Sequence, residues 1–333
     1  SQESTPNCFL LTLYFVCITP PIRALLVQVL NHPLPKGPFA TDSESKWDRV
    51  LFNYCSFTND ETDSDSMHNH IRVYCSTDER HLLGETLARR TLELTLMNSP
   101  EVIECLTSAP KLEFERFYVA QQRDFSTTDY EEFGGLVQRC SSLKLLWLIL
   151  PEMHQSEVFL EAIGNAVHLQ ELLLNELTEF GNQVVHDIIL RLLQNSQNRL
   201  QKLHARSAGL DDRCFMEIVE TLPTTRLEDL SLKIGIGVQG ILAFANQLPK
   251  IKFLKKIEVE PYPPWHNIPA LLPIFRAQEE ECRPALVQGM LENYSVATLR
   301  LNSSGTDLTY FTRVNRVRRK VSESAGSIPL GLW

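Results

Sequence analysis

The chain has 333 residues, of which 43% are hydrophobic and 22% charged, which is enough to build a large core. Its formal net charge of -9 argues against nucleic acid as the main partner, because neutralising phosphates requires a surplus of Lys and Arg. The eight cysteines are scattered without a C-x-x-C pair, so we expect buried free thiols in a reducing compartment, the cytoplasm, rather than a disulfide framework or a zinc site.

Residues 1–45 are expected to form an N-terminal apolar segment followed by a linker. The run "FLLTLYFVCI" (9–18) has the length of a signal-peptide core, but it lacks a positive flank and a cleavage site, and it is too short to span a bilayer. We therefore expect a buried helix or strand, with Pro20 and Pro21 breaking its continuation. The alternative is a cleaved signal or an anchor, in which case the sequons at Asn293 and Asn302 would become meaningful in a secreted protein.

Residues 46–110 are expected to hold an N-terminal cap and degenerate early repeats, in segments such as "KWDRVLFNYCSF" and "TLELTLMN". The acidic stretch "NDETDSDS" (59–66) lacks the glycine and the terminal glutamate of a calcium loop, so it predicts a solvated loop. His68 and His70 have no partner ligands at a suitable spacing, and we predict no metal site.

From about residue 110 one strand pattern recurs. Its first anchors lie 26 to 31 residues apart, at Leu112, Leu143, Leu169, Leu200, Leu227 and Leu254. Most copies read L-x-x-L-x-L or an aliphatic variant of it, as in Leu143/Leu146/Leu148 and Leu227/Leu230/Leu232. Segments with apolar residues at i, i+3, i+4 and i+7 lie between the strands and predict helices. One such unit cannot bury enough apolar surface alone, whereas a stack of units can.

This repetition resembles the leucine-rich repeats of the ribonuclease-inhibitor-like family, and "YFTRVNRVRRK" (310–320) resembles the terminal helix of microalgal members. The resemblance implies an α/β leucine-rich-repeat solenoid, a curved stack of parallel strands inside with helices outside. The solenoid would cover residues 111–310, with an insertion near 261–281, and residues 311–333 would form a C-terminal cap helix and tail. The family usually places Asn or Cys eight residues after the first anchor. Here these positions hold other residues, which predicts irregular turns: Ala120, Pro151, Leu177, Ala208, Gly235 and Tyr262.

A second pattern supports a different class of protein. Gly235, Gly237 and Gly240 spell G-x-G-x-x-G between a strand-like and a helix-like run, and Glu258 follows, as in a dinucleotide-binding turn. In register with the repeats, however, Gly235 falls at a turn, and a stack of repeats offers no reversal of strand order beside the motif. We expect turn glycines and no cofactor, and keep an NAD-dependent oxidoreductase as the alternative.

The outward positions of the predicted strands would form one face. Early repeats would present aromatic and aliphatic side chains there, and middle repeats a cationic group. Trp, Tyr and Arg carry much of the binding energy at protein interfaces. We therefore predict a non-enzyme with no catalytic residues that binds a protein of unknown identity, without nucleic acid and without membrane contact. A nuclear location is a further alternative, because of the basic run at 313–320. The predicted partner-binding residues are Phe114, Arg116, Tyr118, Trp147, Ile149, Leu173, Lys202, His204, Arg206 and Lys233.

Overall fold

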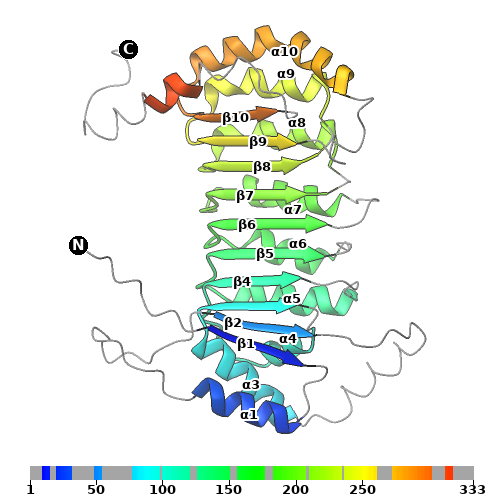
Figure 1. Ribbon diagram of the computed structural model, residues 1–333, viewed down its shortest axis with the longest axis vertical. Helices are drawn as coiled ribbons and strands as arrows, with labels where there is room; N and C mark the ends of the chain where they lie inside the picture. The colour runs from blue at the N-terminus through cyan, green and yellow to red at the C-terminus, as the bar shows by residue number, and fades with distance from the viewer. Residues whose placement is uncertain are drawn as a thin grey trace. The chain divides into compact units, whose positions relative to one another are not determined.

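The computed structural model describes residues 10–15, 20–31, 49–54, 77–97, 100–120, 126–150, 156–176, 183–207, 210–234, 236–260, 272–301 and 312–317. The chain divides into two compact units, unit 1 (Ser1–His168) and unit 2 (Leu169–Trp333). In both units strands and helices alternate along the chain (Figure 1).

Unit 1 contains parallel strands that pair in chain order, from β1 to β5. Its elements are β1 (Leu10–Phe15), α1 (Pro20–Asn31), β2 (Arg49–Tyr54), α3 (Thr77–Arg90), β3 (Glu93–Met97), α4 (Pro100–Thr107), β4 (Arg116–Ala120), α5 (Thr127–Arg139), β5 (Leu145–Leu150) and α6 (Glu157–Gly164).

Unit 2 follows the same scheme, with parallel strands paired in chain order from β6 to β10. Its elements are β6 (Glu171–Glu176), α7 (Val184–Gln194), β7 (Lys202–Arg206), α8 (Asp212–Thr221), β8 (Asp229–Lys233), α9 (Val238–Gln247), β9 (Lys256–Glu260), α10 (Leu272–Glu292) and β10 (Thr298–Leu301). Short 3-10 turns, η1 (Leu222–Thr224) and η2 (Leu248–Lys250), extend α8 and α9, and residues 312–317 form a last short helix.

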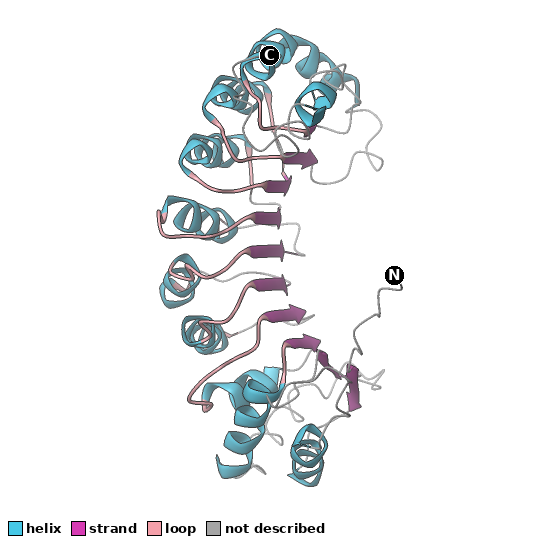
Figure 2. Ribbon diagram, turned by 90° about the vertical axis from the view of Figure 1, so that its left-hand side faces the viewer, coloured by secondary structure: helices cyan, strands magenta, loops and turns pink. Residues whose placement is uncertain are grey.

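Within each unit the strands lie along one side and the helices along the other (Figure 2). Side chains alternate along a strand, so every second residue points between the strands and the helices. The five predicted anchors Leu143, Leu169, Leu200, Leu227 and Leu254 are all buried there. The predicted α/β fold, with parallel strands on the inside and helices outside, is confirmed.

A repeated backbone contact sets the register at which each strand enters the sheet. The Gln201 carbonyl accepts hydrogen bonds from the N–H groups of Glu228 and Asp229, at 2.8 and 3.0 Å. The carbonyls of Leu92, Glu115, Gln170, Glu228 and Lys255 each do the same for two successive N–H groups of the next repeat. Because this contact recurs in both units, successive strands begin at matching positions.

The N-terminal apolar run contributes a strand. β1 pairs in parallel with β2, with Leu10 opposite Arg49. The following prolines separate this strand from α1, as expected, and they begin that helix, since the first turn of a helix needs no N–H donor from proline. Among the described residues, no helix is both long and apolar enough to cross a bilayer. The acidic stretch 59–66, His68, His70 and Asn302 lie outside the described residues.

Candidate functional site

The outward strand positions of unit 1 form a regular array, which we call the unit 1 face. Tyr118 lies opposite Trp147 in the next strand, and Arg116 lies opposite Leu145. On the other side of β4, Tyr118 lies opposite Thr95 and Arg116 opposite Glu93. Two residues further along the same strands, Met97, Ala120 and Ile149 lie opposite one another and complete the array.

The predicted position of Phe114 on this face is wrong. Phe114 is fully buried, and its ring packs 5.0 Å from that of Phe117. The observed pairing of Arg116 with Leu145 makes Phe114, not Leu112, the equivalent of the anchor Leu143. The signal was present in the sequence, because Phe114, Phe117 and Val119 match the spacing of the anchors, whereas an anchor at Leu112 puts Glu115 in the core.

This correction moves two site residues into contact. With the shifted register, Tyr118 becomes the direct neighbour of Trp147, and their ring centroids lie 5.3 Å apart with a tilt of 58°. Rings at this distance attract each other beyond the burial of their area. Trp147 is half-buried, and among the described residues its buried Nε1 has no hydrogen-bond partner. The face therefore holds a fixed aromatic pair between the aliphatic side chains of Leu145 and Ile149.

Arg116 borders the aromatic pair and is held by an ion pair. Its guanidinium lies 3.3 Å from the Glu93 carboxylate, which is buried, while the arginine side chain is 58% exposed. Glu93 thus keeps Arg116 in place at the edge of the apolar array. Met97, at 37% exposure, adds an apolar side chain that the sequence analysis missed. The alternation in Glu93–Met97, with Leu94 and Leu96 buried, was the signal for it.

The outward positions of unit 2, the unit 2 face, carry mostly charged and polar side chains. The predicted outward residues of β6, β7 and β8 lie side by side as expected, with Leu173 opposite His204 and His204 opposite Ser231. Two residues further along the strands, Arg206 and Lys233 are also direct neighbours. A further row alternates in charge across the sheet, through Glu171, Lys202, Asp229 and Lys256.

Most of these charges are paired within unit 2. Lys202 Nζ lies 3.0 Å from Glu171, and Arg300 lies 3.2 Å from Glu258. Lys256 contacts both Asp229, at 3.7 Å, and Glu258, at 2.9 Å. Burial pulls the pKa of Lys256 down, but the Glu258 hydrogen bond and the two carboxylate charges outweigh it and raise the pKa. Of the predicted cationic residues, Lys202 is therefore neutralised by a neighbouring carboxylate, as are Lys256 and Arg300 on the same face.

The glycine motif has a structural explanation. Gly237 is the N-cap of α9, and the N–H groups of Gly237 and Gly240 donate to Asp212 Oδ1 at 2.7 and 3.0 Å. A carboxylate from α8 thus occupies the position at which a dinucleotide-binding turn would hold a phosphate. The strand order of unit 2 also shows no reversal beside β8. Gly235 itself lies outside the described residues.

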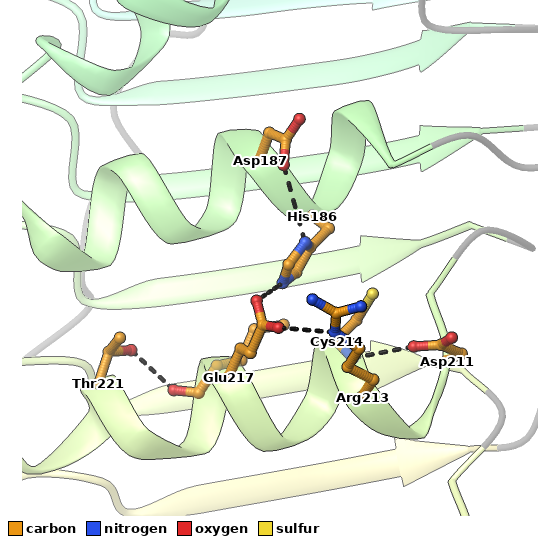
Figure 3. A network of polar contacts seen from close by, with 8 residues as sticks. His186, Asp187, Asp211, Arg213, Cys214, Glu217 and Thr221 are labelled. Atoms are coloured by element: carbon orange, nitrogen blue, oxygen red, sulfur yellow. Dashed lines mark hydrogen bonds and ion pairs between the residues drawn. The ribbon is translucent and has the colours of Figure 1, made fainter.

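A polar network ties α7 to α8 (Figure 3). His186, which is 6% exposed, places Nε2 3.3 Å from Glu217 Oε2, and Arg213 Nε donates to Glu217 Oε1 at 3.0 Å. Asp187 lies 3.8 Å from His186 Nδ1. Cys214 lies beside this network; it is buried, and its backbone N–H donates to Asp211. Among the described residues, no group of three or more His, Cys, Asp or Glu side chains is arranged to hold a metal ion.

The described cysteines Cys105, Cys140, Cys214 and Cys282 are free thiols, and all are buried. Burial raises the pKa of Cys140 and of Cys214 to about 11, which keeps both thiols protonated and unreactive at neutral pH. These four agree with the expectation of buried free thiols.

No protein-family model matches the chain, and neither does any curated protein. The fold and the faces described above are thus the basis for any statement about function.

Proposed function

We propose that the chain is a leucine-rich-repeat protein of the ribonuclease-inhibitor-like kind, acting as a non-catalytic module that binds another protein through its strand faces. The observation that carries the proposal is the aromatic pair of Tyr118 and Trp147 on the outward side of unit 1. Around it stand Leu145, Ile149 and Met97, so the solvent-facing side of this sheet is apolar where a purely structural sheet would be polar.

The two faces would contribute differently to binding. Aromatic side chains in an apolar setting, such as Trp147, supply most of the energy of protein interfaces. The paired charges of unit 2 would lose solvent on binding, and such pairs add little net affinity while penalising partners of the wrong charge. We therefore assign the anchor to unit 1 and a selective role to the unit 2 face. The four free thiols support a reducing compartment such as the cytoplasm.

The test uses the tagged full chain and its variants Trp147→Ala and Tyr118→Ala. Each is cross-linked in a lysate of the source cells, and captured proteins are quantified by mass spectrometry. A protein captured by the parent chain is then purified and titrated against each variant. Truncation of a hot-spot residue weakens binding by at least about 2 kcal/mol, roughly 30-fold in Kd.

Val158→Ala is the matched control, because Val158 is an apolar side chain of α6 with 46% exposure that belongs to neither strand face. It should leave capture and Kd unchanged. Equal capture by the parent chain and both unit 1 variants would falsify the proposal, provided that circular dichroism shows all three proteins to be folded.

The nicotinamide-dependent oxidoreductase remains a distinct alternative with a direct test. If the N–H groups of Gly237 and Gly240 serve only as hydrogen-bond donors to Asp212, titration of the chain with NADH should show no saturable change in nicotinamide fluorescence. Saturable binding that is lost in a Gly240→Ala variant would favour the oxidoreductase.

A further inference from the structure

The exposed large apolar side chains of unit 2 gather at one place. Among the described residues of this unit they are Phe253 (50% exposed), Leu291 (52%), Tyr294 (47%) and Val317 (60%). They come from the segment before β9, the end of α10 with the turn before β10, and the 312–317 helix. Figure 1 shows this last helix, in red, at the tail of the β10 arrow.

Hydrogen bonds show that the three segments adjoin. The side-chain amide of Asn293 donates to the carbonyls of Leu248 and Ile251, at 2.7 and 2.9 Å. That of Asn315 donates to the carbonyls of Asn293 and Val296, both at 3.0 Å. Asn293 and Asn315 are themselves buried, so the exposed side chains beside them project from a fixed framework.

Exposed basic residues lie among these apolar side chains. Lys250 and Lys252 precede Phe253, and Arg313 and Arg316 precede Val317. No ion pair joins Lys250, Lys252 or Arg313 to another described residue, and in sequence the basic run continues through residues 318–320 as Arg-Arg-Lys. Across the same segments the exposed acid is Glu292. We call this surface the C-terminal edge: Phe253, Leu291, Tyr294 and Val317 with Lys250, Lys252, Arg313 and Arg316.

We propose that the C-terminal edge binds peripherally to the surface of an anionic lipid bilayer. Its apolar side chains are about half exposed, so they are projections rather than the walls of a pocket. A protein partner would need a matching cavity for each projection, whereas the headgroup region of a bilayer accepts apolar side chains of any shape. Lys and Arg beside them are attracted by anionic headgroups.

No helix of the described residues can span a bilayer, but peripheral binding needs none. The net charge of -9 belongs to the whole chain, and beyond about 10 Å such charge is screened at ordinary salt. The local excess of Lys and Arg therefore decides which side meets the membrane. Earlier turns of unit 2 carry Arg199 and Arg226 at the position that Phe253 occupies, directly before an anchor leucine. Compared with these two turns, the C-terminal edge alone combines cations with projecting apolar side chains.

Flotation of the full chain with vesicles tests this surface. One set is pure phosphatidylcholine, and in the other a quarter of the lipid is phosphatidylserine. We expect binding to the anionic vesicles that falls as salt rises. The double variant Lys252→Glu/Arg313→Glu should reduce partition at least roughly 25-fold, since each lost cation is worth about fivefold. Phe253→Ser/Val317→Ser should also reduce it, but with less effect on the salt dependence.

Two control variants make similar substitutions at residues outside the C-terminal edge. Arg199→Glu/Arg226→Glu makes the same charge change on earlier turns, and Trp147→Ala alters the unit 1 face. Both should bind anionic vesicles within about twofold of the parent chain, apart from a small general effect of the added charge. Lack of binding by the folded parent chain, equal binding to both vesicle types, or an equal loss in the Arg199/Arg226 control would each overturn the proposal.

Discussion

The Asp212 carboxylate and the backbone N–H of Gly240 lie 3.0 Å apart, joining one repeat of unit 2 to the next. A Cβ at residue 240 would overlap Asp212 Oδ1 and lie 3.0 Å from the Phe215 ring. Gly240→Ala should therefore lower the free energy of unfolding by about 1–3 kcal/mol, as overpacking does. Urea denaturation measures the change.

Gly135→Ala is the control for this substitution, because a Cβ there would meet no atom within 4 Å. Gly135 lies inside α5, where alanine is preferred, so this variant should be more stable by about 0.5–1 kcal/mol. A change in the free energy of unfolding with the same sign in both variants would contradict the close approach at Gly240.

Asp211 caps α8 and should contribute in a pH-dependent way. Its Oδ1 accepts the Cys214 N–H at 2.9 Å, and chiefly this hydrogen bond holds the pKa of Asp211 below its ordinary 3.8. Asp211→Ala should lower the stability by about 1 kcal/mol at neutral pH. Because the folded pKa is depressed, this contribution is present above 3.8 and disappears as pH falls through the folded pKa. Denaturation curves of the two proteins should converge in acid, and a difference that persists there would contradict this role.

His168 should make the protein sensitive to mild acid. Partial burial lowers the pKa of His168 below its ordinary 6.5, against an opposing hydrogen bond with the Cys140 backbone. Among the described residues its buried Nε2 has no hydrogen-bond partner. As pH falls below 6.5, the unfolded chain takes up the proton before the folded chain does, so stability drops until the folded pKa is reached. Thermal melts across this range should show a weaker dependence of Tm on pH for His168→Gln than for the parent chain. An unchanged dependence would show that His168 is not the source of the acid sensitivity.

The described thiols should not react with alkylating reagents in the folded protein. Burial holds the pKa of Cys140 and Cys214 at about 11, and the thiolate is the reactive species. Iodoacetamide at neutral pH, with peptide mapping, should leave Cys105, Cys140, Cys214 and Cys282 unmodified until denaturant is added. Rapid labelling of Cys140 in the native protein would contradict the packing around it.

Asn293 should remain unglycosylated even when the chain is directed through a secretory pathway. Its side chain is 1% exposed, and its Oδ1 accepts the N–H groups of Ser295 and Val296 at 2.9 and 2.8 Å. Asn293→Ala would also remove the acceptor of the buried Ser295 and Val296 N–H groups, at about 1–3 kcal/mol for each such group. Intact mass and denaturation measure the two effects, and a glycan on the folded chain at Asn293 would refute this account.

The strand and helix order of both units follows from local patterns in the sequence. Apolar residues at every second position, as Leu230 and Leu232 in β8, mark a strand with one buried side whatever its neighbours are. For this reason the sequence predicted the burial of the five anchor leucines from Leu143 to Leu254. It also predicted the side-by-side placement of Leu173, His204 and Ser231.

Only the tertiary structure decided which side chains meet across the repeats. A register shift of two residues keeps the alternation intact, so alternation alone allowed an anchor at Leu112 or at Phe114. The anchor spacing favours Phe114, and the pairing with β5 shows that this register joins Tyr118 to Trp147. The hydrogen bond from the Gly240 N–H to Asp212 and the hydrogen bonds from Asn293 to Leu248 and from Asn315 to Asn293 likewise join chain segments far apart in sequence. Local periodicity determines which side of a strand is buried, whereas contacts between repeats arise only when the whole unit packs.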